Sequence, residues 1–364
     1  MKRRDVFKAS AALGLAGLAP RLAAAQVQAN YNPAPKGWRR FELVTRLEPQ
    51  GGAHKAWIPL PTFETQDWQR PGAVNWTGNF RSAQRVKDPK YGAEMLQVEW
   101  AGDQQNPHVE VTTQVQTQSR NVFARLGPVA PLSDAERQRS LAATELLPTG
   151  GLVKETATEI IRGKRGDEAQ ARAIYDWVVE NTFRNAQTMG CGVGDIEGMI
   201  KTGNLNGKCA DLNALFVGLA RSVGLPARDV YGLRVAPSEF GFRALGAGSA
   251  NVTKAQHCRA EVWLAKTGWT PVDPADVRKV VLEEPPGNLG MNDAKVVTVR
   301  KALFGQWEGN WIAYNDGHDI KLPGSAQAPI GFLMYPQAEN AKGPLDSLDP
   351  DKFKYTITSK ELTA

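Results

Sequence analysis

The chain has 364 residues, of which 42% are hydrophobic and 23% charged, an ordinary composition with room for two or three packed domains. Its formal net charge of +6 would by itself favour nucleic acid or an anionic membrane as a partner. The excess is concentrated at the N-terminus, because residues 1–25 hold five Lys or Arg and one Asp, a balance of 5 − 1 = +4 that leaves 6 − 4 = +2 for the rest. No long basic run follows, so we expect no nucleic-acid partner.

Residues 1–25 have the order of an export signal. The basic start, MKRRDVFK, is followed by the apolar stretch ASAALGLAGLA and by three alanines before Gln26. The Arg3-Arg4 pair resembles that of a twin-arginine signal, and the apolar stretch is too short to anchor the chain in a bilayer. We expect a twin-arginine signal peptide over 1–25 and a periplasmic mature protein without membrane insertion; the alternative is a plain amphipathic helix.

Residues 37–127 show the period-2 alternation of β-strands. Apolar and β-branched side chains alternate through 41–47, 96–100 and 109–117, and turns with Gly and Pro separate these runs. The pattern predicts an N-terminal β-sandwich domain over 37–127.

Helical periodicity dominates the next part of the chain. One helix is expected from Asp167, and a second begins near Gly207 and ends at Gly224, with Pro226 two residues on. Strands are predicted at 228–235, 256–264, 269–272, 311–314, 330–335 and 353–357, and a further helix between 292 and 303. Helices followed by antiparallel strands favour the α+β class, with a core over 150–285 that residues 286–364 complete.

Cys209 is the first candidate for chemistry. It lies at the predicted start of the second helix, whose apolar stripe runs along the far side. A helix N-terminus presents unpaired N–H groups and the positive end of the macrodipole, and both favour the thiolate, which is the reactive form. A packing role stays open, because Cys209 precedes Leu212 of the stripe by three residues.

A thiol nucleophile needs a base and a group that orients the base. Strand alternation places His257 on the polar face of 256–264 and Cys258 on the apolar face, where we expect Cys258 to be a small core residue. Asp273 ends the next antiparallel strand, from which its carboxylate could reach the ring of His257. Taken singly, the histidine would be structural and Asp273 a turn or helix cap.

The segments around these residues resemble the core of the transglutaminase-like superfamily of papain-fold thiol enzymes. The matching parts are Gly207-Lys208-Cys209, the helix that leads to Leu225-Pro226-Ala227-Arg228, the strand with His257, and the strand Gly268-Trp269 to Val272-Asp273-Pro274. The resemblance spans about residues 150–280. It implies an α+β core with Cys209 as nucleophile, His257 as general base and Asp273 as orienting acid.

The resemblance also implies acyl transfer on a peptide or protein amide through a Cys209 thioester. Water would complete a peptidase or amidase reaction, and an amine would complete a cross-linking reaction. The backbone N–H of Cys209 would hold the oxyanion, with Asn204 or Asn206 as the second donor. Peptide, peptidoglycan stem, small amide and protein glutamine all stay open as substrates, and no oligomeric state is predicted.

One part of the pattern departs from many members of the family, which follow the histidine with a small residue and then Trp. Cys258 and Arg259 occupy those places. Arg259 is expected to pair with Glu261, or else to lie at the mouth of the site and attract an acidic group. This leaves the preference for substrate and acceptor open.

Three alternatives remain. Cys191, Cys209, His257, Cys258 and Asp273 are metal-ligand types, although their spacing is not that of a zinc site. The fold could serve a non-catalytic binding or assembly module. Cys191 could pair with Cys258 after export, which would leave Cys209 free. No phosphate loop, dinucleotide motif or calcium loop is present in the sequence, so we expect no cofactor.

Overall fold

We analysed a computed structural model that describes residues 30–50, 52–124, 128–349 and 353–363. The predicted signal peptide over 1–25 lies outside the described residues. Within them, no helix combines the length and the apolar character needed to cross a membrane.

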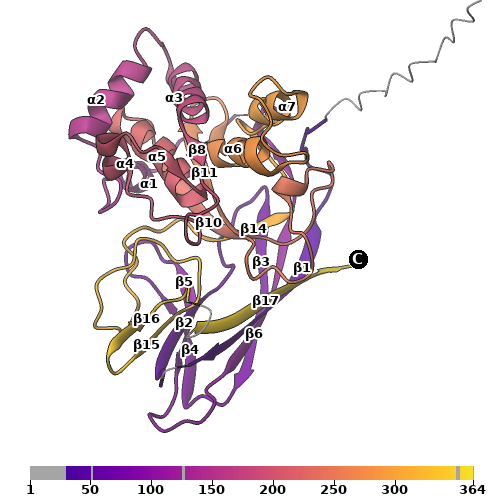
Figure 1. The fold of residues 1–364 in the computed structure, drawn as a ribbon, viewed down its shortest axis with the longest axis vertical. Helices are drawn as coiled ribbons and strands as arrows, with labels where there is room; N and C mark the ends of the chain where they lie inside the picture. Colours follow the sequence, from indigo (N-terminus) through magenta and orange to yellow (C-terminus); the bar gives the residue numbers. More distant parts are fainter. Residues whose placement is uncertain (1–29, 51, 125–127, 350–352, 364) are drawn as a thin grey trace, which may run out of the picture.

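Two antiparallel sheets build the lower half of the molecule in Figure 1. The first has the order β17-β1-β6-β3 and the second β16-β15-β2-β5-β4. These strands are β1 (Arg39–Pro49), β2 (Lys55–Pro59), β3 (Gln69–Gly78), β4 (Ser82–Lys87), β5 (Glu94–Glu99), β6 (Val109–Thr117), β15 (Gln337–Asn340), β16 (Gly343–Leu345) and β17 (Phe353–Leu362).

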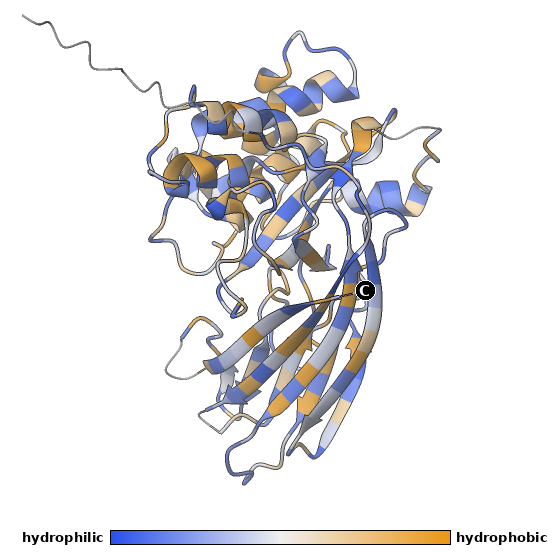
Figure 2. Ribbon diagram, turned by 90° about the vertical axis from the view of Figure 1, so that its right-hand side faces the viewer, coloured by the Kyte–Doolittle hydropathy of each residue, from blue (hydrophilic) through white to orange (hydrophobic). Residues whose placement is uncertain are grey.

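An apolar core that includes Leu47, Ile58, Val98 and Val111 lies between the two sheets. Along β6 the burial alternates residue by residue, as the period-2 pattern predicted. Figure 2 shows the same alternation as bands of orange and blue along the long strands. The N-terminal strands therefore form a two-layer β-sandwich.

The C-terminal strands differ from the expectation that residues 286–364 complete the core. β17 pairs along its length with β1, and β15 pairs with β2, so both extend the sandwich. Only the earlier part of this segment joins the core, where β14 (Trp311–Asn315) pairs with β10 (Ala227–Arg234). Residues 330–335 form no strand: Ile330 makes a single bridge to Ile320.

The upper half is a four-stranded antiparallel sheet, β12-β11-β10-β14, covered by helices. Its remaining strands are β11 (Gln256–Leu264) and β12 (Gly268–Val272), close to the predicted bounds. The helices are α1 (Asp134–Leu141), α2 (Gly151–Ile160), α3 (Asp167–Asn181), α4 (Ile196–Thr202), α5 (Cys209–Ser222), α6 (Pro274–Glu283) and α7 (Ala294–Ala302). Two short pairings complete the fold: β8 (Phe183–Arg184) with β9 (Asn206–Gly207), and β7 (Arg120–Asn121) with β13 (Gln306–Trp307).

The two faces of this core sheet differ in character. Ala260 and Val262 of β11 pack with Leu215 and Phe216 of α5 in the largest apolar cluster. The other face carries Trp311 of β14, which packs with Trp68 of the sandwich. Helices on one face and the sandwich on the other give the α+β architecture that the sequence predicted.

Candidate active site

Cys209 is the first residue of α5 and is 3% exposed. The N–H groups in the first turn of a helix have no intrahelical acceptor, and the macrodipole places positive charge there. The predicted position is therefore confirmed: the sulfur lies where a helix stabilises an anion.

Asp211 ties this helix start to the loop that carries Cys191. Its Oδ2 accepts a hydrogen bond from the Lys208 N–H at 2.9 Å, and its Oδ1 accepts from Val193 and Gly194 N–H, both at 2.9 Å. The Ala210 N–H donates to the Cys191 carbonyl, also at 2.9 Å. The Cys191 loop is thus fixed against the first turn of α5.

Two glycines make this close approach possible. A Cβ at Gly207 would lie 2.4 Å from Asp211 Oδ2, and one at Gly192, whose φ is +94°, would lie 1.8 Å from the same atom. Neither position could carry a side chain without displacing the carboxylate.

The structure brings His257 and Asp273 together as predicted. His257 Nε2 lies 2.7 Å from Asp273 Oδ2 across the β11–β12 pair, and both side chains are buried. Asp273 also caps α6, since its Oδ1 accepts from the Asp276 N–H at 3.0 Å. Asp273 therefore caps α6 through Oδ1 and contacts the imidazole through Oδ2.

Two residues that the sequence analysis missed support the pair. Asn213 of α5 donates to Asp273 Oδ1 at 3.2 Å and to the Cys258 carbonyl at 2.8 Å, which links the nucleophile's helix to the base's strand. Trp311 Nε1 donates to the His257 carbonyl at 2.8 Å. Trp311 is distant in sequence, and although Asn213 follows Cys209 by four residues on α5, no local pattern shows that its amide reaches Asp273.

Asp276 is a second carboxylate beside the imidazole. Its Oδ2 lies 3.4 Å from His257 Nε2, and its Oδ1 accepts from Arg234 Nη2 at 2.5 Å. The sequence offered one signal for Asp276: it follows Asp273 by three residues, which places the two carboxylates on the same side of the first turn of α6.

These charges set the protonation of His257. Burial and the positive charge of Arg234 lower its pKa, but Asp276 and Asp273 outweigh them and raise the pKa to about 9. The imidazole is therefore protonated at neutral pH. Because both carboxylates engage Nε2, Nδ1 is the ring nitrogen left for Cys209.

Cys209 has the opposite shift. Hydrogen bonds from Cys191 and Cys258 are the largest contributions that hold the pKa of Cys209 well below its usual range, and His257 adds to them against the opposing effect of burial. The pKa of Cys191 is raised well above its usual value, chiefly by this same hydrogen bond, so Cys191 keeps its proton. Both shifts therefore favour a thiolate at Cys209 beside an imidazolium at His257.

Cys191 carries a single thiol proton with two acceptors nearby. Its Sγ lies 3.4 Å from the Gln256 carbonyl, and it also contributes the hydrogen bond to Cys209. A charged acceptor forms the stronger bond, so the proton belongs with the thiolate when Cys209 is ionised.

The structure changes three expectations about neighbouring residues. Cys258 is buried in an apolar cluster, as expected, but its thiol also reaches Cys209. Cys191, Cys209 and Cys258 are all free thiols, so no Cys191–Cys258 disulfide is present. Asn204 and Asn206 do not line the cavity at Cys209, which leaves the second oxyanion donor unassigned.

Arg259 neither pairs with Glu261 nor lies at the mouth. It is 1% exposed, donates to the Glu308 carbonyl at 3.1 Å, and stacks on Trp311. Glu261 instead binds Arg120 and Arg228. Arg259 Nε lies 3.7 Å from Asp273 Oδ2, so its charge acts on the orienting acid rather than on a substrate.

Cys209 and His257 both line a cavity of about 790 Å³. Its lining includes Gly190 and Cys191 of the Cys191 loop, Leu348, and Tyr355 of β17. This volume is within the range of binding sites for drug-sized ligands. Cys209 and His257 therefore border this space although both side chains are almost fully buried.

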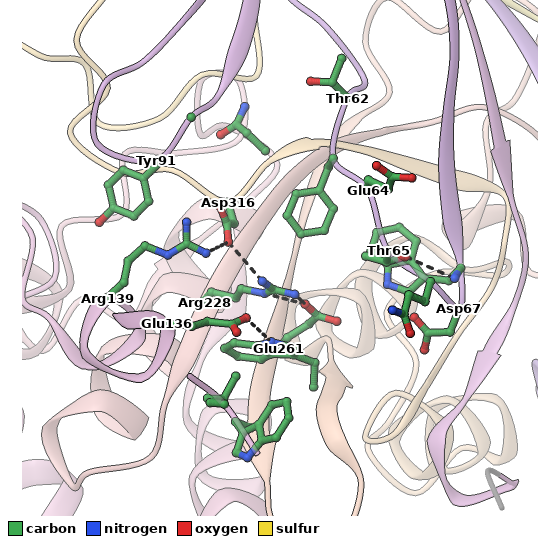
Figure 3. Close-up of a pocket in the computed structure, with 18 of the residues that line it drawn as sticks. Thr62, Glu64, Thr65, Asp67, Tyr91, Glu136, Arg139, Arg228, Glu261 and Asp316 are labelled. Atoms are coloured by element: carbon green, nitrogen blue, oxygen red, sulfur yellow. Dashed lines mark hydrogen bonds and ion pairs between the residues drawn. The ribbon is translucent and has the colours of Figure 1, made fainter. Parts of the chain in front are cut away.

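A second cavity of about 610 Å³ lies where the sandwich meets the core sheet. Figure 3 shows Arg139 and Arg228 directed at Asp316, and Arg228 also at Glu261. Among the described residues that line it there is no cysteine or histidine. Its buried charged side chains pair with one another. We therefore interpret this cavity as a structural feature of the junction between the sandwich and the core sheet.

The donor atoms of His257, Asp273 and Asp276 lie within 4.8 Å of one another, which bears on the metal alternative. Their oxygens already accept hydrogen bonds from Asn213, from the Asp276 N–H and from Arg234. A guanidinium in direct contact repels a cation, so these residues form an imidazole with two supporting acids rather than a metal centre.

Asp276→Asn should lower the pKa of His257 by about 1–3 units, because it removes an opposite charge within contact distance and leaves Arg234 unopposed. The imidazolium would then lose its proton at a lower pH. Titration of the His257 ring resonances, assigned with His257→Gln, measures this. Asp103→Asn, a matched change at an exposed position, should leave the pKa of His257 unchanged. An unchanged pKa of His257 in Asp276→Asn would contradict the conclusion that Asp276 raises it.

Cys191→Ala should raise the pKa of Cys209 by about one unit, because the thiolate loses a charge-assisted hydrogen bond. Cys191→Ser keeps a donor at the same place and should restore most of the shift. The pH dependence of Cys209 alkylation, read by peptide mass mapping, separates the two variants. Identical profiles for wild type and Cys191→Ala would show that this bond contributes nothing.

The comparisons with known proteins bear on this geometry. The model of the transglutaminase-like superfamily core matches residues 154–274, a segment that contains Cys209, His257 and Asp273. An uncharacterized protein of Haemophilus influenzae is 37% identical over 350 residues, which cover 92% of this chain and 94% of the relative.

Solved structures show weaker similarity. A candidate cysteine protease from Cytophaga hutchinsonii is 15% identical, with 89% of this chain and 98% of that chain covered and a TM-score of 0.48. The periplasmic domain of TgpA from Pseudomonas aeruginosa is 16% identical, with 66% and 88% covered and a TM-score of 0.34. At these scores we draw no functional conclusion from either structure.

The family match completes the description of the fold. The predicted class is confirmed: an α+β transglutaminase-like core follows a strand-rich N-terminal region. The chain belongs to the same family as the Haemophilus influenzae protein, and its residues 154–274 form a transglutaminase-like superfamily core.

Proposed function

We propose that this protein is a cysteine-dependent enzyme that transfers acyl groups from amide bonds through a thioester on Cys209. The observation that carries the proposal is the thiol at the start of α5 in one cavity with an imidazole that a carboxylate holds at 2.7 Å. A thiolate beside an imidazolium is the arrangement that nucleophilic acyl transfer requires.

In the first half-reaction the Cys209 sulfur forms a bond to the amide carbonyl carbon, and the carbonyl oxygen takes the negative charge. The N–H of Cys209 faces that oxygen from the helix end. The C–N bond then breaks, and His257 gives its proton to the leaving amine. The products are a thioester on Cys209 and a neutral imidazole.

In the second half-reaction water or an amine attacks the thioester carbonyl, and His257 takes the proton of the attacking group. The C–S bond breaks and the thiolate returns. Water gives a peptidase or amidase, and an amine gives a transglutaminase-type cross-link. Asp273 and Asp276 stabilise the imidazolium in both halves and fix the ring so that Nδ1 faces the sulfur.

The proposal includes export to the periplasm. It rests on the sequence MKRRDVFK, the short apolar stretch after it, and the alanines before Gln26. Changing Arg3 and Arg4 to Lys should retain the protein in the cytoplasm with its N-terminus uncleaved. Cell fractionation shows where the protein is, and mass spectrometry of the N-terminal peptide shows whether it is cleaved. Normal export of the variant would exclude the twin-arginine route.

Iodoacetamide tests the nucleophile without knowledge of the substrate. In the wild type, Cys209 should be alkylated at a pH well below about 8.5, where ordinary thiols ionise, while Cys191 and Cys258 stay unlabelled. In His257→Ala the labelling of Cys209 should shift to higher pH, because the thiolate loses its counter-ion. Peptide mass mapping over a pH series measures each cysteine separately.

His108→Gln, a change in the sandwich away from the site, is the matched control and should leave the labelling profile unchanged. If Cys209 reacts as an ordinary thiol and ignores the loss of His257, the enzyme proposal is overturned. The chain would then be a binding or assembly module on the transglutaminase-like fold.

A further inference from the structure

Within the described part of the chain, the cavity at Cys209 is lined by basic side chains and by no acidic one. Among the described residues that border it, the charged side chains besides His257 are Arg184, Lys208, Arg234, Lys254, Lys279 and Lys354. They come from several elements and loops far apart in sequence, and they meet only in the folded chain. The concentration of one sign of charge is therefore a property of the cavity and not of a sequence run.

Carboxylates behind the wall neutralise only part of this charge. Asp276 binds Arg234, and the single carboxylate of Glu283 serves both Arg184 and Lys279, the latter at 3.8 Å. Lys354 is 60% exposed and lies 3.7 Å from Glu48. Asp276, Glu283 and Glu48 thus face four cations, and none of the three lines the cavity.

Two lysines on the wall have no carboxylate partner in the described structure. Lys208 donates to the Thr188 carbonyl at 2.7 Å, and Lys254 is exposed without a recorded ion pair. A carbonyl satisfies the hydrogen bond of an ammonium group but not its charge. Even with the thiolate of Cys209 counted, the cavity keeps an excess of positive charge.

The second cavity shows that this imbalance is specific to the site. Its wall has three arginines and five carboxylates, and its buried arginines pair with Glu261 and Asp316 (Figure 3). The second cavity thus has more carboxylates than cations on its wall, whereas the described wall of the cavity at Cys209 has cations and no carboxylate.

Two of the cations flank the reacting groups. Lys208 directly precedes Cys209. Lys279 follows Asp276 by three residues on α6, so it lies about 4.5 Å further along the helix axis from the acid that touches His257. Burial and the charge of Arg234 lower the pKa of Lys279 to about 8, which is the behaviour of an ammonium without enough counter-charge.

We propose that the cavity selects acyl donors that carry a carboxylate on a residue flanking the scissile amide, with Lys279, Lys208 and Lys254 as the cationic contacts. This inference rests on the proposed function of Cys209 and adds the substrate class. Leu348 and the exposed Met189 also line the cavity and add apolar contact. A peptide with an acidic residue next to an apolar residue therefore fits the lining.

Binding to the Cys209→Ala protein tests the class of ligand without turnover. The probes are acetylated, amidated alanine pentapeptides with a single Glu, Gln or Lys placed at each interior position in turn. Isothermal titration at low salt should show at least one Glu peptide binding about tenfold more tightly than its Gln counterpart, with the Lys peptide weakest. The preference should shrink at high salt, where exposed charges are screened.

Lys279→Gln in the same background should remove most of the preference for Glu over Gln. Lys301→Gln, an exposed matched change on α7, should leave it intact. Retained circular dichroism spectra and unfolding midpoints show that each variant is folded.

Equal affinity for the Glu and Gln peptides at every position, or absence of binding by both, overturns the anionic preference. Iodoacetamide labelling of Cys209 in the wild type is a separate readout. If Cys209 is a reactive thiolate but the peptides do not differ, the enzyme proposal stands and only the substrate class falls. If the peptides differ but Cys209 is an ordinary thiol, the cavity is an anion-binding site without catalysis.

Discussion

The structure depends on one constraint, which is the need to keep a thiolate charged in a place where water scarcely reaches it. Cys209 is 3% exposed, and burial alone would favour the neutral thiol. The first turn of α5, two thiol donors and the imidazolium of His257 together reverse that preference. Each of these supports needs its own positioning, and most of the polar residues around the site supply it.

The imidazolium of His257 needs more stabilisation than the thiolate, because it too is buried and it also lies near the positive charge of Arg234. Asp273 alone could orient the ring, but the raised pKa of His257 reflects Asp276 first and Asp273 second among the favourable charges. Asp276 in turn is held by Arg234, so removal of either acid leaves a buried cation without its partner. Breaking such a buried pair typically costs about 3–5 kcal/mol, so stability and chemistry are coupled here.

The sequence predicted the parts of the site that local rules govern. The helix start at Cys209, the strand with His257 and the strand end at Asp273 all follow from periodicity and end signals, and the structure places them within a few residues of the predicted bounds. It could not predict contacts made by long-range packing. Asn213 directly follows Leu212 of the apolar stripe of α5, and nothing near it in sequence shows that its amide contacts Asp273, 60 residues further on.

Two of the wrong interpretations have the same cause. Alternation along β11 placed Arg259 and Glu261 on one face, and from this we expected a pair. Arg120 and Arg228 reach Glu261 from other elements, and Trp311 packs over Arg259. The last strand, β17, likewise joins the sandwich because β1 offers it a ten-residue register. Period-2 patterns show which face a residue occupies, but the partner on that face is fixed by tertiary packing.

The positive cavity and the buried thiolate are two consequences of the same charge distribution. Cations near the sulfur favour its ionised form, and the same cations attract an anionic substrate to the mouth. A bound carboxylate would neutralise part of that field and so weaken the support for the thiolate at the moment of attack. The ion pair with His257, fixed by Asp273 and Asp276 behind the ring, does not depend on those lysines. Under the proposed function, this arrangement would let the site accept a negative substrate and still keep Cys209 ionised.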